Sequence, residues 1–143
     1  MEELKELEDL QTLVIDDEPE VLEVMVDILE QAGYPAQSTS DSENASRLLE
    51  TSKFDLIVSD IMMPHLSGLQ LLEIAKRQNP DVQVVLVTGY ANRQVALEAL
   101  EKGASGFIEK PIEIEPFLAA VRQALWRRRL KQNATSSGQR GLA

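Results

Sequence analysis

Four apolar runs in the chain each lead into polar residues of kinds that bind metal ions and phosphoryl groups. The residues at the ends of these runs are, in chain order, Asp16-Asp17, Asp60, Thr88 and Lys110. They converge only if the runs are parallel strands of one sheet, because the carboxyl ends of such strands share an edge at which open α/β sheets bind ligands. Carboxylates, a hydroxyl and an ammonium at one edge would form a site for a metal ion and a phosphate.

The three carboxylates favour a metal site. At about 4 Å and an effective dielectric constant near 20, each close pair of carboxylates costs about 4 kcal/mol, which a cation would offset. Helix capping ahead of Pro19 would account for one acid of the Asp16-Asp17 pair, but not for Asp60 at the end of a neighbouring strand. Oxygen ligands favour Mg²⁺, with Mn²⁺ as the alternative, and the chain has no cysteine for a thiolate zinc site.

The other groups suit the transfer of a phosphoryl group. A carboxylate can attack phosphorus and form an acyl phosphate, so Asp60 is the candidate phosphoryl acceptor. Lys110 stands at the end of a strand, and Pro111 fixes the turn that follows. Its ammonium is therefore placed to neutralise the charge of the transferred group. Thr88 offers a hydroxyl to a phosphoryl oxygen, and Gly89 leaves space for the group to enter.

The elements that would position these groups alternate between strand and helix. The apolar patterns predict strands over residues 12–16, 34–39, 54–59, 82–87 and 105–109, each followed by a helix. The strands are apolar throughout rather than alternating, which indicates a parallel sheet covered on both faces. With right-handed crossovers, the predicted fold is a doubly wound, flavodoxin-like (βα)5 α/β fold with five parallel strands in the order 2-1-3-4-5.

One domain accounts for most of the chain. We expect it to span residues 11–127, after an N-terminal helical extension (1–10) that carries Leu4 and Leu7. Residues 128–143 are expected to be a basic helix end and a flexible tail, because the segment from 133 onwards is rich in Ser and Gly and has no apolar pattern.

Charge and composition exclude several classes of function. The net charge is −10, divided into −16 over residues 1–115 and +6 over 116–143. An acidic body repels nucleic acid, and the basic run at 127–131 is typical of a solvated helix end, with a contact to phosphates or to an acidic partner as the alternative. No apolar stretch reaches the roughly 20 residues of a membrane span. The acidic N-terminus is not a signal peptide, so a cytoplasmic protein is expected.

The ordered set of motifs resembles the receiver domain of two-component response regulators, the CheY-like superfamily. The resemblance covers about residues 11–127 and is carried by Asp16-Asp17, Asp60 with Met63-Pro64 and Gly68, Thr88-Gly89, and Phe107 three residues before Lys110-Pro111. It implies that a sensor histidine kinase phosphorylates Asp60 with Mg²⁺. It also implies that the domain is a switch rather than an enzyme, catalysing only its own phosphorylation and dephosphorylation.

The resemblance also implies roles for individual site residues. Asp17, Asp60 and the backbone carbonyl of Met62 would hold the metal directly, and Asp16 would act through water. Lys110 would pair with the phosphoryl group on Asp60.

A conformational switch is implied at two further positions. Thr88 would move toward the phosphoryl group and Phe107 would turn inward behind it, remodelling the face formed by the last two helices and the fifth strand. The alternative for Phe107 is an ordinary core side chain. Met62 and Tyr90 stand where members of the family tune water access, and their bulk predicts slow hydrolysis of the acyl phosphate.

Partners follow from the same resemblance. We expect a sensor histidine kinase, a downstream protein partner or an output domain carried on a longer chain, and a homodimer promoted by phosphorylation. His65, the only histidine, lies in a loop after Pro64 and is interpreted as loop surface rather than as a phosphoryl donor.

Two other classes of function compete with this prediction. An aspartyl-phosphate phosphatase or phosphotransferase of the haloacid-dehalogenase type would need an acid two residues after Asp60, where Met62 stands. A nucleotide or flavin binder of the same fold would need a glycine-rich loop after the first strand, where residues 16–19 are Asp-Asp-Glu-Pro.

Overall fold

A five-stranded parallel sheet forms the centre of the computed structural model, which describes residues 9–90 and 92–142. The strands are β1 (Thr12–Ile15), β2 (Gln37–Thr39), β3 (Leu56–Asp60), β4 (Gln83–Thr88) and β5 (Gly106–Glu109). Their order is β2-β1-β3-β4-β5, and every neighbouring pair is parallel. The predicted fold class and strand order are confirmed.

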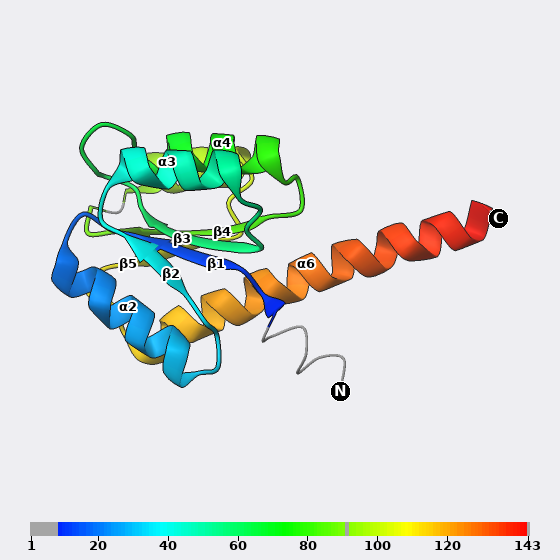
Figure 1. The fold of residues 1–143 in the computed structure, drawn as a ribbon, viewed down its shortest axis with the longest axis horizontal. Helices are drawn as coiled ribbons and strands as arrows, with labels where there is room; N and C mark the ends of the chain where they lie inside the picture. The colour runs from blue at the N-terminus through cyan, green and yellow to red at the C-terminus, as the bar shows by residue number, and fades with distance from the viewer. Residues whose placement is uncertain (1–8, 91, 143) are drawn as a thin grey trace.

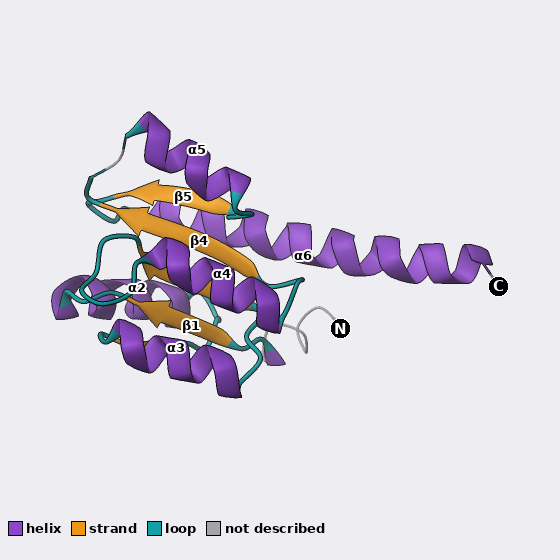
Figure 2. Ribbon diagram, turned by 90° about the horizontal axis from the view of Figure 1, so that it is seen from above, coloured by secondary structure: helices purple, strands orange, loops and turns teal. Residues whose placement is uncertain are grey.

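Five helices cover the two faces of the sheet. They are α2 (Pro19–Gln31), α3 (Ser42–Thr51), α4 (Gly68–Gln78), α5 (Arg93–Glu101) and α6 (Ile114–Leu142). Figure 1 shows α3 and α4 above the sheet and α2 and α6 below it. In Figure 2 the strand arrows point away from the part of α6 that projects from the domain.

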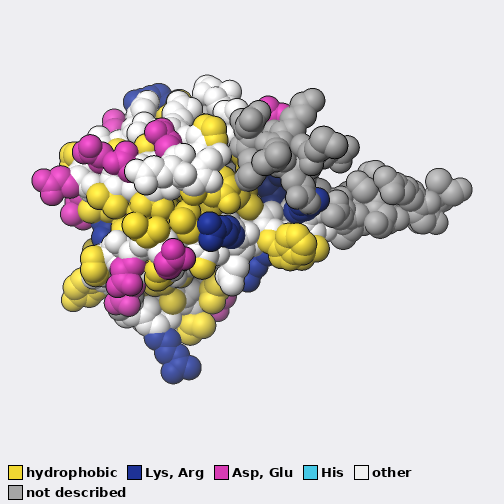
Figure 3. Space-filling model, turned by 90° about the horizontal axis from the view of Figure 1, so that it is seen from below, with side chains coloured by type: hydrophobic (Ala, Val, Ile, Leu, Met, Phe, Trp, Pro, Cys, Tyr) yellow, Lys and Arg dark blue, Asp and Glu magenta, His cyan; other side chains and the backbone are white. Residues whose placement is uncertain are grey.

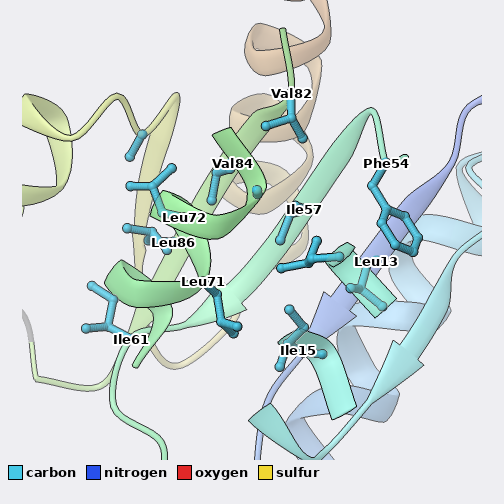
Figure 4. Close-up of a cluster of buried hydrophobic side chains, with 14 of the residues drawn as sticks. Leu13, Ile15, Phe54, Ile57, Ile61, Leu71, Leu72, Val82, Val84 and Leu86 are labelled. Atoms are coloured by element: carbon cyan, nitrogen blue, oxygen red, sulfur yellow. The ribbon is translucent and has the colours of Figure 1, made fainter. Parts of the chain in front are cut away.

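Each face of the sheet has its own apolar core. Along β1, Leu13 and Ile15 point into the core beneath α3 and α4, whereas Val14 points into the core against α2 and α6. β4 alternates in the same way, with Leu86 on the first side and Val87 on the second. Because both faces are covered, the strands read as continuous apolar runs. Figure 4 shows the first of these cores.

Local capping fixes where several helices begin. The Asp41 side chain accepts a hydrogen bond from the Glu43 amide at 3.0 Å, and the Asn92 side chain accepts one from Val95 at 2.8 Å. Ser67 starts α4 with a reciprocal capping box to Gln70. Such caps satisfy amides that the first turn of a helix leaves unpaired.

The C-terminal helix differs from the expectation. Phe117, Val121 and Ala124 of α6 are buried in the core, and the helix then continues to Leu142 through the segment expected to be a flexible tail. No proline follows Pro116, so nothing in the sequence removes a backbone hydrogen bond from this helix. The expected extension at 1–10 with Leu4 and Leu7 lies almost wholly outside the described residues.

Two arginines of α6 are bound to the domain. Arg128 donates to a carboxylate oxygen of Asp55 at 2.8 Å, and the other oxygen of Asp55 accepts from the Gln11 amide at 2.9 Å. Arg127 donates to the Ser105 carbonyl at 3.1 Å. The interpretation of this basic run as a solvated helix end is therefore wrong for Arg128, which pairs with an acid of the same chain, whereas Arg127 stays exposed. We refer to these two contacts as the α6 tether.

The charge asymmetry of the sequence is visible on the surface. On the face covered by α2 and α6, Figure 3 shows a band of hydrophobic side chains with Asp and Glu gathered mainly at its left.

No helix in the described part of the chain is both long enough and apolar enough to cross a membrane.

Candidate functional site

Four acidic side chains lie together at the carboxyl ends of β1 and β3. Asp16, Asp17, Glu18 and Asp60 each place a carboxylate oxygen within 4.8 Å of the others. Asp16 and Asp60 are buried, at 0% and 4% exposure, while Asp17 and Glu18 are exposed. The strand register explains this meeting, since Ile15 of β1 pairs with Ser59 of β3 and the acids are the next residue of each strand.

The ammonium of Lys110 lies among these acids. Its Nζ is 3.0 Å from Asp16 Oδ2, 3.2 Å from Asp60 Oδ2 and 2.9 Å from Glu18 Oε1. The backbone amide of Lys110 donates to the Thr88 carbonyl at 2.8 Å, which extends the β4–β5 ladder to this residue. The side chain is 12% exposed, so the charge is largely removed from water.

Burial shifts the protonation equilibria of the site. Desolvation raises the pKa of Asp16, and the hydrogen bond from the Glu18 amide and the nearby ammonium of Lys110 offset part of this rise. Desolvation, followed by the charge of Asp16, raises the pKa of Asp60. For Lys110, burial lowers the pKa, but the hydrogen bond to Glu18 and the nearby carboxylates of Asp16 and Asp60 outweigh it, so the pKa is raised. The site therefore holds two carboxylates whose charge is unfavourable without more positive charge nearby.

The acidic cluster has the donors that a hard divalent cation prefers. Oδ2 of Asp16 is buried and, although Lys110 lies 3.0 Å away, it has no hydrogen-bond partner among the described residues. Asp17 faces solvent, which leaves room for water ligands. Carboxylate oxygens with space for water suit Mg²⁺ or Mn²⁺ better than zinc.

Mg²⁺ should therefore stabilise the folded chain. Binding to the folded state alone adds about 1.4 kcal/mol to the free energy of unfolding when Mg²⁺ is at about ten times its dissociation constant. Urea denaturation followed by circular dichroism, with and without Mg²⁺ at matched ionic strength, measures this. Asp17→Asn should remove most of the gain, and an equal gain in that variant would place the cation elsewhere.

The loop after β3 is held by its backbone. The Ile61 amide donates to Val87 in β4 at 2.9 Å, and the Gly68 amide donates to the Ile61 carbonyl at 2.9 Å. The Met62 amide donates to Asp60 Oδ1 at 3.3 Å. This contact holds the Met62 backbone beside Asp60, and the Met62 side chain is exposed.

Ser42 is a support of this loop that the sequence reasoning missed. Its hydroxyl donates to the Pro64 carbonyl at 2.6 Å and accepts from the Leu66 amide at 3.1 Å. No local signal reveals a contact that spans more than twenty residues.

Close packing against the end of β3, the strand that carries Asp60, restricts position 68 to glycine. A Cβ atom at this position would lie 2.4 Å from the Asp60 carbonyl oxygen and 3.0 Å from Ile61 Cα. Real Cβ atoms do not approach backbone so closely, so any side chain at 68 would displace the strand end that carries Asp60.

Thr88 and Gly89 lie beside Lys110. The buried Thr88 hydroxyl accepts from the Tyr90 amide at 3.0 Å and keeps its own hydrogen to donate. A Cβ at Gly89 would lie 3.8 Å from Lys110 Cδ, an ordinary contact. The structure leaves room for a methyl group at position 89, so steric hindrance does not require glycine there. The Tyr90 side chain is 74% exposed and lies outside the acidic cluster.

Two further residues from the sequence analysis are not members of the acidic cluster. Phe107 is half-buried and packs against the core beneath α3 and α4. His65 is exposed, and its Nδ1 lies 3.2 Å from Glu43 Oε1. His65 thus lies on the loop surface, as expected.

Glu18 is a site residue that the sequence reasoning missed. Its carboxylate is the closest of the three acids to Lys110 and is separated from it by 92 positions. In the sequence, Glu18 stood only as the third residue of the run Asp-Asp-Glu-Pro at 16–19. Its position directly after Asp16-Asp17 is the one signal that could have included it.

Comparisons with known proteins agree with this geometry. The family model described as response regulator receiver domain matches residues 12–122. The nitrogen assimilation regulatory protein NtrX of Azorhizobium caulinodans is 36% identical over 122 residues, covering 84% of this chain and 27% of the relative. The chain thus spans about a quarter of that relative's length.

Solved structures give the same family. A response regulator from Burkholderia pseudomallei, crystallised with a phosphorylated aspartic acid, calcium ion and citrate, is 32% identical with a TM-score of 0.72, covering 78% of this chain and 66% of that one. The beryllofluoride-activated NtrC4 receiver domain dimer is 31% identical with a TM-score of 0.77, covering 82% and 98%. The buried aspartate at the end of β3, the acidic cluster around it and these matches show that the chain belongs to the receiver domains of two-component response regulators.

Proposed function

We propose that this receiver domain is a phosphorylation-controlled switch that accepts a phosphoryl group on Asp60 from the phosphohistidine of a sensor histidine kinase, with Mg²⁺. The observation that carries the proposal is the setting of Asp60. Its carboxylate is buried at a strand end, 3.2 Å from the ammonium of Lys110 and within an acidic cluster.

The side chains around Asp60 suit the transfer. A carboxylate oxygen of Asp60 forms the new O–P bond as the N–P bond of the phosphohistidine breaks. Lys110, whose pKa is raised, remains cationic and pairs with the phosphoryl oxygens. The Thr88 hydroxyl donates to the same group. Bound Mg²⁺ would neutralise part of its charge, held by Asp17, Asp60 and the Met62 carbonyl directly and by Asp16 through water.

The switch follows from the change of charge at Asp60. Lys110 links the acids to β5, and its backbone amide is bonded to Thr88, so a new phosphoryl group alters both residues together. We propose that Thr88 moves toward the group and Phe107 turns inward, which remodels the α5–β5–α6 face. The bulk of Met62 and Tyr90 slows hydrolysis, and the domain acts on no substrate beyond its own phosphorylation and dephosphorylation.

The proposed partners are a sensor histidine kinase and either a downstream protein or an output domain on a longer chain. A homodimer promoted by phosphorylation is part of the proposal, and the activated NtrC4 receiver, to which this chain is similar, is itself a dimer. The haloacid-dehalogenase alternative finds no support in the comparisons.

Intact mass after incubation with acetyl phosphate and Mg²⁺ tests the proposal. The wild type should gain one phosphoryl group, and the gain should be absent in Asp60→Asn and after addition of a chelator. Asp27→Asn, which removes an exposed acid of α2, is the matched control and should be labelled like the wild type. A gain in Asp60→Asn equal to that of the wild type would remove Asp60 as the acceptor.

A further inference from the structure

A hollow of about 480 Å³ lies at the edge of the sheet opposite the acidic site. Its lining includes Lys76, Gln83, Gly103, Ser105, Arg127 and Lys131. β4 begins at Gln83 in this hollow and ends at Thr88 beside Lys110, so the two sites lie at opposite ends of the same strand. Figure 2 shows α6 passing the starting ends of β4 and β5.

The lining of the hollow is cationic. Lys76 comes from the end of α4, and Arg127 and Lys131 come from α6, while no acid is among the described residues that line it. This is unusual in a chain whose net charge is −10. A local excess of positive charge in an acidic protein attracts anions to that place and not to the rest of the surface.

Neutral groups hold two of the cations in place. Lys76 donates to the Val82 carbonyl at 2.8 Å, and Arg127 donates to the Ser105 carbonyl at 3.1 Å. A carbonyl satisfies one N–H but does not cancel the charge, and each cation has further donors. The two side chains are therefore positioned without being neutralised by these bonds.

The cations are also close enough to affect one another. Burial, and next the charge of Lys131, lower the pKa of Lys76, with Asp81 acting weakly in the opposite direction. A group with several negative charges in the hollow would favour the charged form of Lys76. The same group would replace the water that Lys76 has lost on burial.

We propose that this hollow binds a compact anion with two or more negative charges, either a phosphate compound or a polycarboxylate. A volume of about 480 Å³ lies within the usual range for small-molecule sites. Leu130 and Gly103 leave part of the wall apolar, so an anion with a small carbon skeleton fits as well as an inorganic one. The site is separate from the phosphoryl acceptor and does not depend on it.

Calorimetric titration of metal-free protein with pyrophosphate, and separately with citrate, tests the proposal. In about 0.15 M NaCl, where the Debye length is about 8 Å, we expect saturable binding by the wild type. Lys76→Gln and Lys131→Gln should each weaken it by about tenfold, because each removes a charge-assisted contact. Arg122→Gln, at an exposed position of the same helix, should leave the affinity within about twofold.

The two titrants distinguish the sources of the anion. Tighter binding of pyrophosphate indicates a phosphate compound, and tighter binding of citrate a polycarboxylate. Circular dichroism should show that Lys76→Gln is folded, and Lys131→Gln, at an exposed position, gives an independent reading. Labelling by acetyl phosphate should be unchanged in all three variants, which separates this test from that of Asp60.

Two results would overturn the proposal. One is the absence of saturation up to about 10 mM of either titrant, which is too weak for a specific site. The other is equal weakening by Arg122→Gln and the two lysine variants, which would show attraction to the basic helix in general.

Discussion

Lys110→Met is expected to lower the free energy of unfolding by about 3 kcal/mol at neutral pH without Mg²⁺, because it leaves buried carboxylates without their cation. The ammonium lies 3.0 Å from Asp16 and 3.2 Å from Asp60, both almost fully buried. Methionine keeps the volume of the lysine stem, so the loss is electrostatic rather than a loss of packing. Acetyl phosphate labelling of Asp60 should fall by at least about tenfold, since Lys110 pairs with the transferred group.

The loss of stability in Lys110→Met should grow as the pH rises. The pKa values of Asp16 and Asp60 are already raised in the folded protein, and loss of Lys110 raises them further. The folded variant then binds more protons than the unfolded chain above pH 3.8, so its stability falls as the pH rises through the folded pKa values. The loss of stability in the variant is therefore small near pH 3.8, the pKa of the unfolded chain, and complete above the folded-state pKa values of the two aspartates.

Urea denaturation of the wild type and the variant across this pH range measures the effect. Lys53→Met, which removes an exposed lysine, is the control and should show a change of less than about 0.5 kcal/mol. Mg²⁺ should restore part of the stability of Lys110→Met. A deficit that is the same in acid and at neutral pH would rule out repulsion between the carboxylates as its cause.

Gly68→Ala is expected to cost about 3 kcal/mol of stability, since the added methyl group overlaps backbone that cannot rotate away. The new Cβ would lie 2.4 Å from the Asp60 carbonyl oxygen, and the clash can be relieved only by moving the loop or the end of β3. A shift of about 1 Å at a reacting group lowers rates by about 100-fold, and we expect a loss of this order in the rate of acetyl phosphate labelling.

Gly89→Ala provides the matched control for this variant. It adds the same methyl group to another glycine of the site, but there the nearest atom is Lys110 Cδ at 3.8 Å. Its stability should stay within about 0.5 kcal/mol of the wild type. Equal losses in the two variants would show that close approach at Gly68 is not the reason for its glycine.

The sheet and the acidic site could be predicted because they depend on patterns that repeat along the chain. Apolar runs at regular spacing mark the strands, and the handedness of crossovers then fixes their order. Once Asp16 and Asp60 were assigned to the ends of neighbouring strands, their meeting followed from the topology. The strand expected over 34–39 is shorter in the structure, where β2 begins at Gln37. Pro35 has no N–H to offer a ladder, which accounts for the later start.

Contacts between distant side chains could not be predicted in the same way. Glu18 with Lys110, and Asp55 with Arg128, are separated by 92 and 73 positions. Around Asp55 and Arg128 the local pattern does not differ from that of an ordinary surface charge, and Lys110 was predicted to face a phosphoryl group rather than Glu18. The length of α6 was missed for a related reason, since a polar segment without proline is compatible with helix and coil alike.

The α6 tether gives the C-terminal helix a fixed rotational phase. Arg127 and Arg128 hold one side of the helix against Ser105 and Asp55, which fixes the orientation in which the backbone of α6 leaves the domain. Inserting one residue after Lys131 would turn everything beyond it by about 100°. Inserting seven would return it to within about 20° of the original direction. Binding of a protein to this part of the helix would therefore depend on the number of residues between it and the tether as well as on its sequence.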